Sequence, residues 1–321
     1  MWKIYQGDAK EKMKEIESQT VQCVVTSPPY WGLRDYGEKD QLGLEKTPEE
    51  YVGKMVEIFR EVRRVLRDDG TVWLNLGDSY AQSGGSGSEE YQKRHKQFGK
   101  IIDSGTKQNS RNAPKGYKPK DLIGIPWLVA FALRADGWYL RQDIIWAKPN
   151  PMPESVTDRC TKAHEYIFLL TKSAKYYYDA EAVKEPTSIN SHKKRKDGGL
   201  SPYELNAYSK ENLPGGIGKY NPTQNTKRNK HSVWTVSTQP YPGAHFATFP
   251  PKLIEPCILA GSKPGDVILD PFAGSGTTSY VAEDNGRDSI AIDLSKKYCK
   301  QIEARMKRIY PRLLHDRGVI S

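Results

Sequence analysis

Apolar residues in this chain fall into two repeating patterns. Short apolar runs, most of them followed by Gly, Pro or Asp, predict β-strands, and segments with apolar residues three and four apart predict helices. The predicted strands cover residues 2–7, 21–25, 71–76, 138–147, 165–171, 267–270 and 289–293. The predicted helices cover residues 9–16, 47–66, 121–135, 250–261, a segment after residue 276, and 297–309. Because strands and helices alternate, the pattern predicts an α/β fold.

Two boundaries carry strong local signals. Thr47 and Pro48 supply an N-cap and a proline at the first helical position, and Glu49 and Glu50 place negative charge in the first turn. The segment Asp68-Asp69-Gly70 predicts a turn before strand 71–76. The helix that begins at Thr47 is therefore predicted to pack an apolar stripe inward and to expose a basic outer face.

Two long segments lose the apolar pattern. Residues 79–120 are rich in Gly, Ser, Lys, Gln and Asn and predict a mobile loop, which either closes over a polyanion or is an insertion. Residues 181–240 are rich in Lys, Asn, Gly and Tyr, which suits either phosphate and base contacts or a solvated surface insertion. The basic runs there are 192–196 and 227–231, and the aromatic residues near them are Tyr203, Tyr208, Tyr220 and Trp234.

Charge and composition narrow the choice of partner. The 49 Lys and Arg residues outnumber the 39 Asp and Glu residues, and the net charge of +10 favours a polyanion such as nucleic acid. No apolar run approaches membrane-spanning length and the N-terminus lacks a signal-peptide core, so we expect a soluble, cytoplasmic protein. The four cysteines and six histidines lack ligand spacing, so neither a disulfide framework nor a metal site is predicted.

The stretch Thr26-Ser27-Pro28-Pro29-Tyr30-Trp31 follows the apolar strand 21–25 directly. Two prolines fix two φ angles and remove two N–H donors, which leaves the carbonyls of Ser27 and Pro28 as acceptors. A hydroxyl beside these carbonyls, followed by two aromatic rings, suits a flat molecule with N–H donors at its edge, such as a nucleobase with an exocyclic amino group. On this stretch alone, a strand that ends in a Pro-Pro turn fits equally well.

A second stretch, residues 270–278, predicts a strand, then Gly274 and Gly276, then a helix. Glycines let the backbone approach a ligand, and Asp293, at the end of the next strand, can accept hydrogen bonds from two ribose hydroxyls. The loop lacks the third glycine of a dinucleotide site and the Gly-Lys-Ser/Thr of a P-loop, so it suits an adenosine without phosphates. Asp8, after the first strand, either faces this ligand or caps the helix that follows.

Together the two stretches resemble the S-adenosylmethionine-dependent amino-methyltransferases of DNA, in the permuted beta class and of the N4-cytosine type. Residues 26–30 resemble their catalytic motif and residues 270–276 their cofactor motif, in the order of that class. Lesser motifs match at Gly7-Asp8, 146–149 and 245–252. The resemblance implies a Rossmann-like class I methyltransferase fold, with a mostly parallel twisted sheet, helices on both faces and a circularly permuted motif order.

The same resemblance implies a division of the chain and a set of site residues. The division is a catalytic part, 1–180, with the mobile loop 79–120; a target-recognition insertion, 181–240; and a cofactor-binding part, 241–321. The implied catalytic residues are Ser27, Pro28, Pro29 and Tyr30. The residues expected to bind S-adenosylmethionine are Asp8 at the adenine, Asp293 at the ribose, Phe272, Gly274 and Gly276 at the methionine part, and Phe249, Asp270 and Thr277 elsewhere in the pocket.

The expected chemistry is direct methyl transfer to an amino group on a base flipped out of duplex DNA. Ser27 and Pro28 would accept the two amino N–H bonds and Tyr30 would stack on the base. Within the family, Ser at the first motif position goes with N4 of cytosine, while N6 of adenine stays open. Cys257 is expected in the core rather than as a nucleophile for carbon-5 transfer. A cognate restriction endonuclease and a homodimer are further candidate partners, and a non-catalytic nucleic-acid binder and an RNA or protein methyltransferase are the alternative functions.

Overall fold

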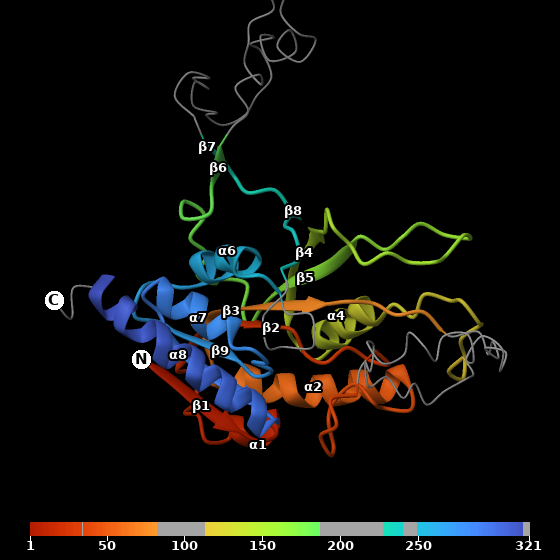
Figure 1. Ribbon diagram of the computed structural model, residues 1–321, viewed down its shortest axis with the longest axis horizontal. Helices are drawn as coiled ribbons and strands as arrows, with labels where there is room; N and C mark the ends of the chain where they lie inside the picture. The colour runs from red at the N-terminus through yellow and green to blue at the C-terminus, as the bar shows by residue number, and fades with distance from the viewer. Residues whose placement is uncertain (34, 82–112, 187–226, 240–248, 317–321) are drawn as a thin grey trace, which may run out of the picture. The chain divides into compact units, whose positions relative to one another are not determined.

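The computed structural model describes residues 1–33, 35–81, 113–186, 227–239 and 249–316 of the 321-residue chain (Figure 1). Contacts divide the chain into two units. The larger unit is Met1–Asp179 with Ser232–Ser321, and the smaller is Ala180–His231. The larger unit holds the sheet, the helices and the predicted site residues, so it carries the functional argument.

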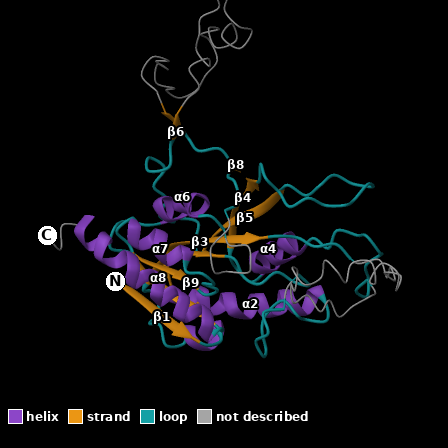
Figure 2. Ribbon diagram, in the orientation of Figure 1, coloured by secondary structure: helices purple, strands orange, loops and turns teal. Residues whose placement is uncertain are grey.

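The larger unit is built on an eight-stranded sheet with the order β1-β10-β9-β2-β3-β5-β4-β8 (Figure 2). Its strands are β1 (Trp2–Gln6), β2 (Val21–Thr26), β3 (Leu66–Leu76), β4 (Tyr139–Ala147), β5 (His164–Thr171), β8 (Val233–Thr235), β9 (Val267–Asp270) and β10 (Asp288–Asp293). All neighbouring pairs are parallel except the two pairs that β5 makes, with β3 and with β4. The sheet is therefore mostly parallel, as predicted.

The strands β2 and β9 lie side by side although some 240 residues separate them in the chain. Cys23 pairs with Ile268, and Val24 pairs with Leu269. Since the two strands are parallel, their carboxyl ends meet at one edge of the sheet. The N-terminal Ser-Pro-Pro-Tyr stretch and the C-terminal glycine turn thereby become neighbours, which is the permuted arrangement that the sequence predicts.

Helices cover both faces of the sheet (Figure 1). On one face α1 (Ala9–Met13) packs on α2 (Pro48–Val65), which packs on α4 (Ile125–Ala135). On the other face α6 (Pro251–Gly261) packs on α7 (Thr277–Asp284), which packs on α8 (Lys296–Asp316). None of the helices in the described ranges is long and apolar enough to cross a membrane.

Helix α2 follows its sequence signals closely. The Thr47 hydroxyl accepts a hydrogen bond from the Glu50 amide at 3.2 Å, and Pro48 is the first helical residue. Its apolar stripe is fully buried at Tyr51, Met55 and Phe59. Each such side chain stabilises the fold by about 1.5–3 kcal/mol relative to an exposed one, so this face anchors the helix on the sheet.

Several predicted boundaries are wrong. Helix α1 ends at Met13 rather than at residue 16, and α8 ends at Asp316 rather than at residue 309. The segment Asp68-Asp69-Gly70 is not a turn before the strand, because β3 already begins at Leu66 and runs through it. The extra residues form an irregularity in the ladder: Val21 pairs with Leu66, but Cys23 pairs with Thr71. Helix α4 begins at Ile125 rather than at residue 121, because the carboxylate of Asp78 accepts the amides of Gly124 and Ile125, each at 3.0 Å.

The predicted loop 79–120 has ordered ends. Tyr80 forms an isolated antiparallel bridge with Leu122, and the Ala81 backbone exchanges hydrogen bonds of 2.8 Å with Asp121 and Lys120. The centre of the segment, residues 82–112, lies outside the described residues. Backbone hydrogen bonds thus hold the two ends of the segment together, and the mobile loop stays a prediction.

The predicted insertion, 181–240, divides between the two units. In the smaller unit, β6 (Glu185–Pro186) and β7 (Lys227–Arg228) form a two-stranded antiparallel ladder. The segment from Ser232 instead joins the main sheet through β8, whose Trp234 is 7% exposed and lies 6.4 Å from Trp73 between ring centroids. Trp234 is therefore a core residue and not one of the exposed aromatic residues predicted to contact bases. Tyr203, Tyr208 and Tyr220 lie outside the described residues.

Candidate active site

A cleft of about 810 Å³ opens at the edge of the sheet where the parallel strands end. Its walls come from the residues that follow β1, β2, β3, β4, β9 and β10, and from the start of β5. Strand β5 contributes its first residues because it runs opposite to its neighbours. Ligands of open α/β sheets bind at this edge, so the cleft is the candidate active site.

Most of the predicted site residues line this one cleft although they are scattered through the chain. Those that line it are Ser27, Pro28, Pro29, Tyr30, Asp8, Phe249, Phe272, Gly274, Thr277 and Asp293. Asp270 and Gly276 do not line it. We call residues 27–30 the catalytic turn and residues 271–276 the cofactor turn.

Asp270 lies behind the wall of the cleft and joins the two turns. Its carboxylate accepts hydrogen bonds from the Thr26 hydroxyl at 2.6 Å, the Thr278 hydroxyl at 2.7 Å and the Phe272 amide at 3.0 Å. Its side chain is buried, and burial raises its pKa to about 6 despite these three donors. Asp270 thus fixes the end of β2 against the start of the cofactor turn.

Gly276 also has a packing reason to be glycine. Its φ of 73° lies in the left-handed region, and a Cβ there would come within 2.9 Å of the Ile302 side chain in α8. Gly274 differs, because a Cβ on it would meet no atom within 4 Å and the residue lines the cleft. Of the two glycines, Gly274 is the one whose backbone is open to a ligand.

Asp293, at the end of β10, holds the cofactor turn from the opposite side. One carboxylate oxygen accepts the Gly274 amide and the other accepts the Ser295 amide, both at 2.8 Å. Burial raises its pKa to about 6, and the nearby Asp270 carboxylate adds to the rise, while the two amides act against it. Each oxygen keeps lone pairs for a ligand, so the group can accept a pair of hydroxyl donors in the cleft.

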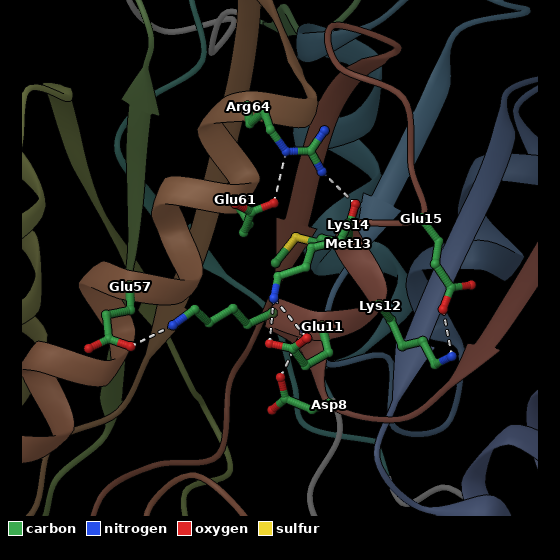
Figure 3. Close-up of polar contacts among 10 residues, drawn as sticks. Asp8, Glu11, Lys12, Met13, Lys14, Glu15, Glu57, Glu61 and Arg64 are labelled. Atoms are coloured by element: carbon green, nitrogen blue, oxygen red, sulfur yellow. Dashed lines mark hydrogen bonds and ion pairs between the residues drawn. The ribbon is translucent and has the colours of Figure 1, made fainter.

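Asp8 lies between the end of β1 and the start of α1. Its carboxylate accepts the Glu11 amide at 3.0 Å and caps α1, as Figure 3 shows, and the residue also lines the cleft. Nearby, Lys10 pairs with Glu57 of α2 at 2.8 Å, and both residues line the same wall. Helix α1 therefore brings charged groups to the side of the cleft that Asp293 borders.

Hydrogen bonds from other elements hold the catalytic turn. The Tyr51 hydroxyl of α2 donates to the Pro29 carbonyl at 3.0 Å, while no hydrogen bond within the described residues reaches the carbonyl of Pro28. Gly77 packs against the Tyr30 ring so closely that a Cβ would lie 2.5 Å from it. The turn is thus rigid, with the Pro28 carbonyl left as an acceptor.

The Tyr30 hydroxyl joins a polar network that sequence reasoning missed. It lies 2.7 Å from a carboxylate oxygen of Glu165 in β5, 3.2 Å from the side-chain oxygen of Asn75 and 3.2 Å from the Ser27 hydroxyl. The other oxygen of Glu165 forms an ion pair with Lys148. Burial and the neighbouring carboxylate raise the Tyr30 pKa well above its ordinary value, so its phenol stays protonated.

The missed residues carry a weak sequence signal. Asn75 interrupts the apolar run 72–76, Glu165 directly precedes the apolar run 166–170, and Lys148 directly follows β4. Lys162 also lines the cleft, and its ammonium nitrogen is buried without a hydrogen-bond partner in the part of the chain that the structure describes. Its pKa is lowered by that burial. Polar residues at strand ends near the cleft are the signal that could have identified this set.

The sheet and its helices define a Rossmann-like α/β fold, and residues of both the catalytic turn and the cofactor turn line one cleft at the carboxyl ends of its strands. Comparison with known proteins identifies the family. The chain matches the DNA methylase family (N6_N4_Mtase) over residues 21–304. It is 45% identical over 307 residues to the type II methyltransferase M.SmaI of Serratia marcescens, in a match that covers 95% of this chain and 91% of that protein.

Two solved structures share the fold. The PvuII DNA methyltransferase, which is cytosine-N4-specific, is 19% identical with a TM-score of 0.61, over 98% of this chain and 93% of that chain. TTHA0409 from Thermus thermophilus, in complex with S-adenosyl-L-methionine, is 21% identical with a TM-score of 0.57, over 96% and 94% of the two chains.

The chain therefore belongs to the DNA methylase family. This membership confirms the predicted class of enzyme, a DNA methyltransferase that uses S-adenosylmethionine, and the structural likeness confirms the predicted fold. The family name covers transfer to both N6 and N4, so membership alone does not decide which amino nitrogen accepts the methyl group.

Proposed function

We propose that this protein transfers a methyl group from S-adenosylmethionine to the N4 amino nitrogen of cytosine in duplex DNA. The observation that carries the proposal is the arrangement of Ser27. A carboxylate can only accept, so the Tyr30 hydroxyl donates to Glu165, and the Tyr30 oxygen in turn accepts the Ser27 proton. The lone pairs of the Ser27 hydroxyl therefore remain available to the cleft, where an amino group can donate to them.

The amino nitrogen of a base is a poor nucleophile because its lone pair is delocalised into the ring. Acceptance of its two N–H bonds by the Ser27 hydroxyl and the Pro28 carbonyl draws the nitrogen towards tetrahedral geometry and frees its lone pair. Both acceptors sit on a turn that Pro29, Tyr51 and Gly77 hold rigid. The turn thus orients the amine before the reaction rather than during it.

The opposite end of the cleft suits the methyl donor. Asp293 would accept the ribose hydroxyls, Gly274 would bring its backbone close to the methionine part, and Asp8 would contact the adenine, as Phe249, Phe272 and Thr277 line the same cleft. When bound, S-adenosylmethionine supplies an electrophilic methyl group on a sulfonium. Asp270 and Gly276 would act from behind the wall, by holding the cofactor turn in place.

A base reaches this cleft only by leaving the duplex, which costs on the order of a few kcal/mol. Stacking on the Tyr30 ring would offset part of that cost, and phosphate contacts of a basic chain would offset more. We assign target recognition to the insertion that begins near residue 181, with its later boundary at His231. A cognate restriction endonuclease belongs to the same proposal, because the relatives are type II methyltransferases. The homodimer and the cytoplasmic location stay predictions from the sequence.

Cytosine is preferred over adenine because the first motif position is Ser27. In the family a serine there goes with N4 of cytosine, and the PvuII enzyme, which shares this fold, is cytosine-N4-specific. A neutral hydroxyl whose proton is held by Tyr30 offers the amine an acceptor without placing a full negative charge beside the base. Adenine N6 is the second candidate, because its amine can make the same two contacts.

The test is label transfer from tritiated S-adenosylmethionine to duplex DNA, followed by digestion and nucleoside analysis. We expect label in N4-methylcytosine, with duplex DNA competing better than RNA. Label in N6-methyladenine would move the assignment to the second base. The absence of transfer to any DNA, from a protein that binds DNA, would instead favour a non-catalytic binder.

A further inference from the structure

A chain of hydrogen bonds leads from the catalytic turn away from the cleft. The Ser27 hydroxyl lies 3.2 Å from the Tyr30 oxygen, and the Tyr30 oxygen lies 2.7 Å from a carboxylate oxygen of Glu165. The turn supplies the first two groups, and β5 supplies the third, 135 residues later. We propose that this chain of hydrogen bonds carries the amine proton to Glu165. This proposal rests on the proposed methyl transfer to a base amine.

The surroundings of Glu165 fit the end of a proton path. Its second oxygen pairs with Lys148, and the side chains of this pair are only 15% and 17% exposed. Lys148 donates to one oxygen of Glu165 and the Tyr30 hydroxyl donates to the other, so the carboxylate begins as an acceptor. The Asn75 amide donates to the same oxygen that Tyr30 contacts, at 3.2 Å, and to the Tyr166 carbonyl at 3.1 Å. These contacts fix the carboxylate where Tyr30 can reach it.

Tyr30 has the right protonation state to pass a proton on. Because its phenol stays protonated, it always has one proton to give and lone pairs to receive another. The oxygen of Asn75 lies 3.2 Å from the same hydroxyl, but the charged Glu165 oxygen is closer and is the stronger acceptor. The hydrogen bonds therefore run, from donor to acceptor, from Ser27 through Tyr30 to Glu165.

The reaction creates a proton that must leave. An amine that gains a methyl group carries one positive charge and one surplus N–H bond. Its proton passes to the Ser27 oxygen as the Ser27 proton passes to Tyr30 and the Tyr30 proton passes to Glu165. One N–H bond breaks, one O–H bond forms on Glu165, and the two hydroxyls end as they began. The amine becomes neutral, and the charge of the Glu165 carboxylate is neutralised beside Lys148.

Lys148, which directly follows β4, and Lys162, from the segment before β5, are the charged groups that face Glu165. The neutral Tyr30 and Asn75 complete the surroundings of its carboxylate within the described residues.

The experiment measures single-turnover methyl transfer to duplex DNA with the full-length protein. We expect Glu165→Gln and Tyr30→Phe each to lower the rate by about 100-fold, the scale of general base catalysis, while the dissociation constants for cofactor and DNA change less than about twofold. The double variant should be no slower than the slower single variant, because one broken link already stops the relay. Glu303→Gln, which removes an exposed carboxylate paired with Lys307 in α8, is the matched control and should leave the rate unchanged.

Two outcomes would overturn the relay. They are a Glu165→Gln rate within about twofold of wild type, and a double variant whose loss is the product of the two single losses. Each of these, seen while the wild type transfers label, leaves the proposed function standing. Label in N6-methyladenine overturns the proposed base but not the relay, since adenine also loses an amino proton. No transfer by the wild type overturns both.

Discussion

The catalytic turn and the cofactor turn follow neighbouring strands of one sheet, but their residues differ in backbone freedom. The catalytic turn holds two prolines and presents oxygen acceptors to the cleft. The cofactor turn holds two glycines with φ of 50° and 73°, and the amide of Gly274 donates to Asp293. One turn is rigid because its residues are restrained, and the other because its neighbours hold a permissive backbone.

A single buried group connects these two kinds of turn. Asp270 accepts from Thr26 at the end of β2 and from the Phe272 amide in the cofactor turn. The two loops that we propose to carry the two substrates are thus fixed relative to each other through a carboxylate that lies behind the cleft wall. The difference between the turns predicts three separable effects of substitution. Changes in the catalytic turn should lower turnover, changes at the cofactor turn should lower cofactor affinity, and changes at Asp270, the buried joint between the turns, should lower stability.

The largest effect is expected at the catalytic turn. Ser27→Ala removes one amine acceptor and the first hydroxyl of the chain to Glu165, so turnover should fall by about 100-fold to 1,000-fold. Cofactor affinity should change by less than about twofold, because the Ser27 hydroxyl bonds to Tyr30 and not to the cofactor turn. Turnover by label transfer and affinity by calorimetry separate the two effects. A large loss of cofactor affinity in this variant would show that the assignment of roles to the two turns is wrong.

The second largest effect is expected at Asp270, the buried joint between the two turns. Asp270→Ala leaves the Thr26 hydroxyl and the Phe272 amide unpaired in a buried site, which should lower the free energy of unfolding by about 3 kcal/mol. Asp270→Asn is the matched control. Its oxygen still accepts from both donors, while Thr278 can accept from the new amide and donate to the Val25 carbonyl at 3.2 Å. Urea unfolding should therefore place the asparagine variant within about 1 kcal/mol of wild type. Equal losses in both variants would mean that the carboxylate charge, not the hydrogen bonds, holds the joint.

Sequence patterns predicted every strand of the main sheet except β8, and motifs that resemble a known family predicted most of the cleft, because both depend on local signals. Ser27, Tyr30 and Gly274 stand in short motifs directly after apolar strands, and parallel pairing then brings those strand ends together. Glu165 was not predicted, because its contact with Tyr30 joins residues 135 positions apart and depends on which face of β5 the side chain takes. Asp270 was predicted to line the cofactor pocket but lies behind its wall. A sequence motif does not determine on which side of the wall a side chain lies.

At the cofactor turn, Asp293→Ala should weaken cofactor binding by about 30-fold. The change removes the acceptor for the ribose hydroxyls and frees the Gly274 and Ser295 amides, and each hydrogen bond to a charged group contributes about 1.5–3 kcal/mol. Turnover at saturating cofactor and DNA should fall much less than affinity. Calorimetry with S-adenosylmethionine and turnover at saturation would measure the two separately. If turnover fell as far as in Ser27→Ala while affinity held, the two turns would not divide the work as proposed.

The smallest expected effect is a pH dependence of cofactor binding. The pKa of Asp293 is raised to about 6, so at pH 7.5 the group is ionised and accepts both hydroxyls, whereas at pH 5 it is mostly protonated. Binding of the cofactor to the ionised form therefore weakens as pH falls through 6, by about tenfold between pH 7.5 and pH 5. Asp270 has a similarly raised pKa but lies behind the wall, so Asp270→Asn should keep this dependence and Asp293→Ala should abolish it. Calorimetric titrations of the three proteins at both pH values test this, and a pH dependence lost in Asp270→Asn instead would place the titrating group at the joint.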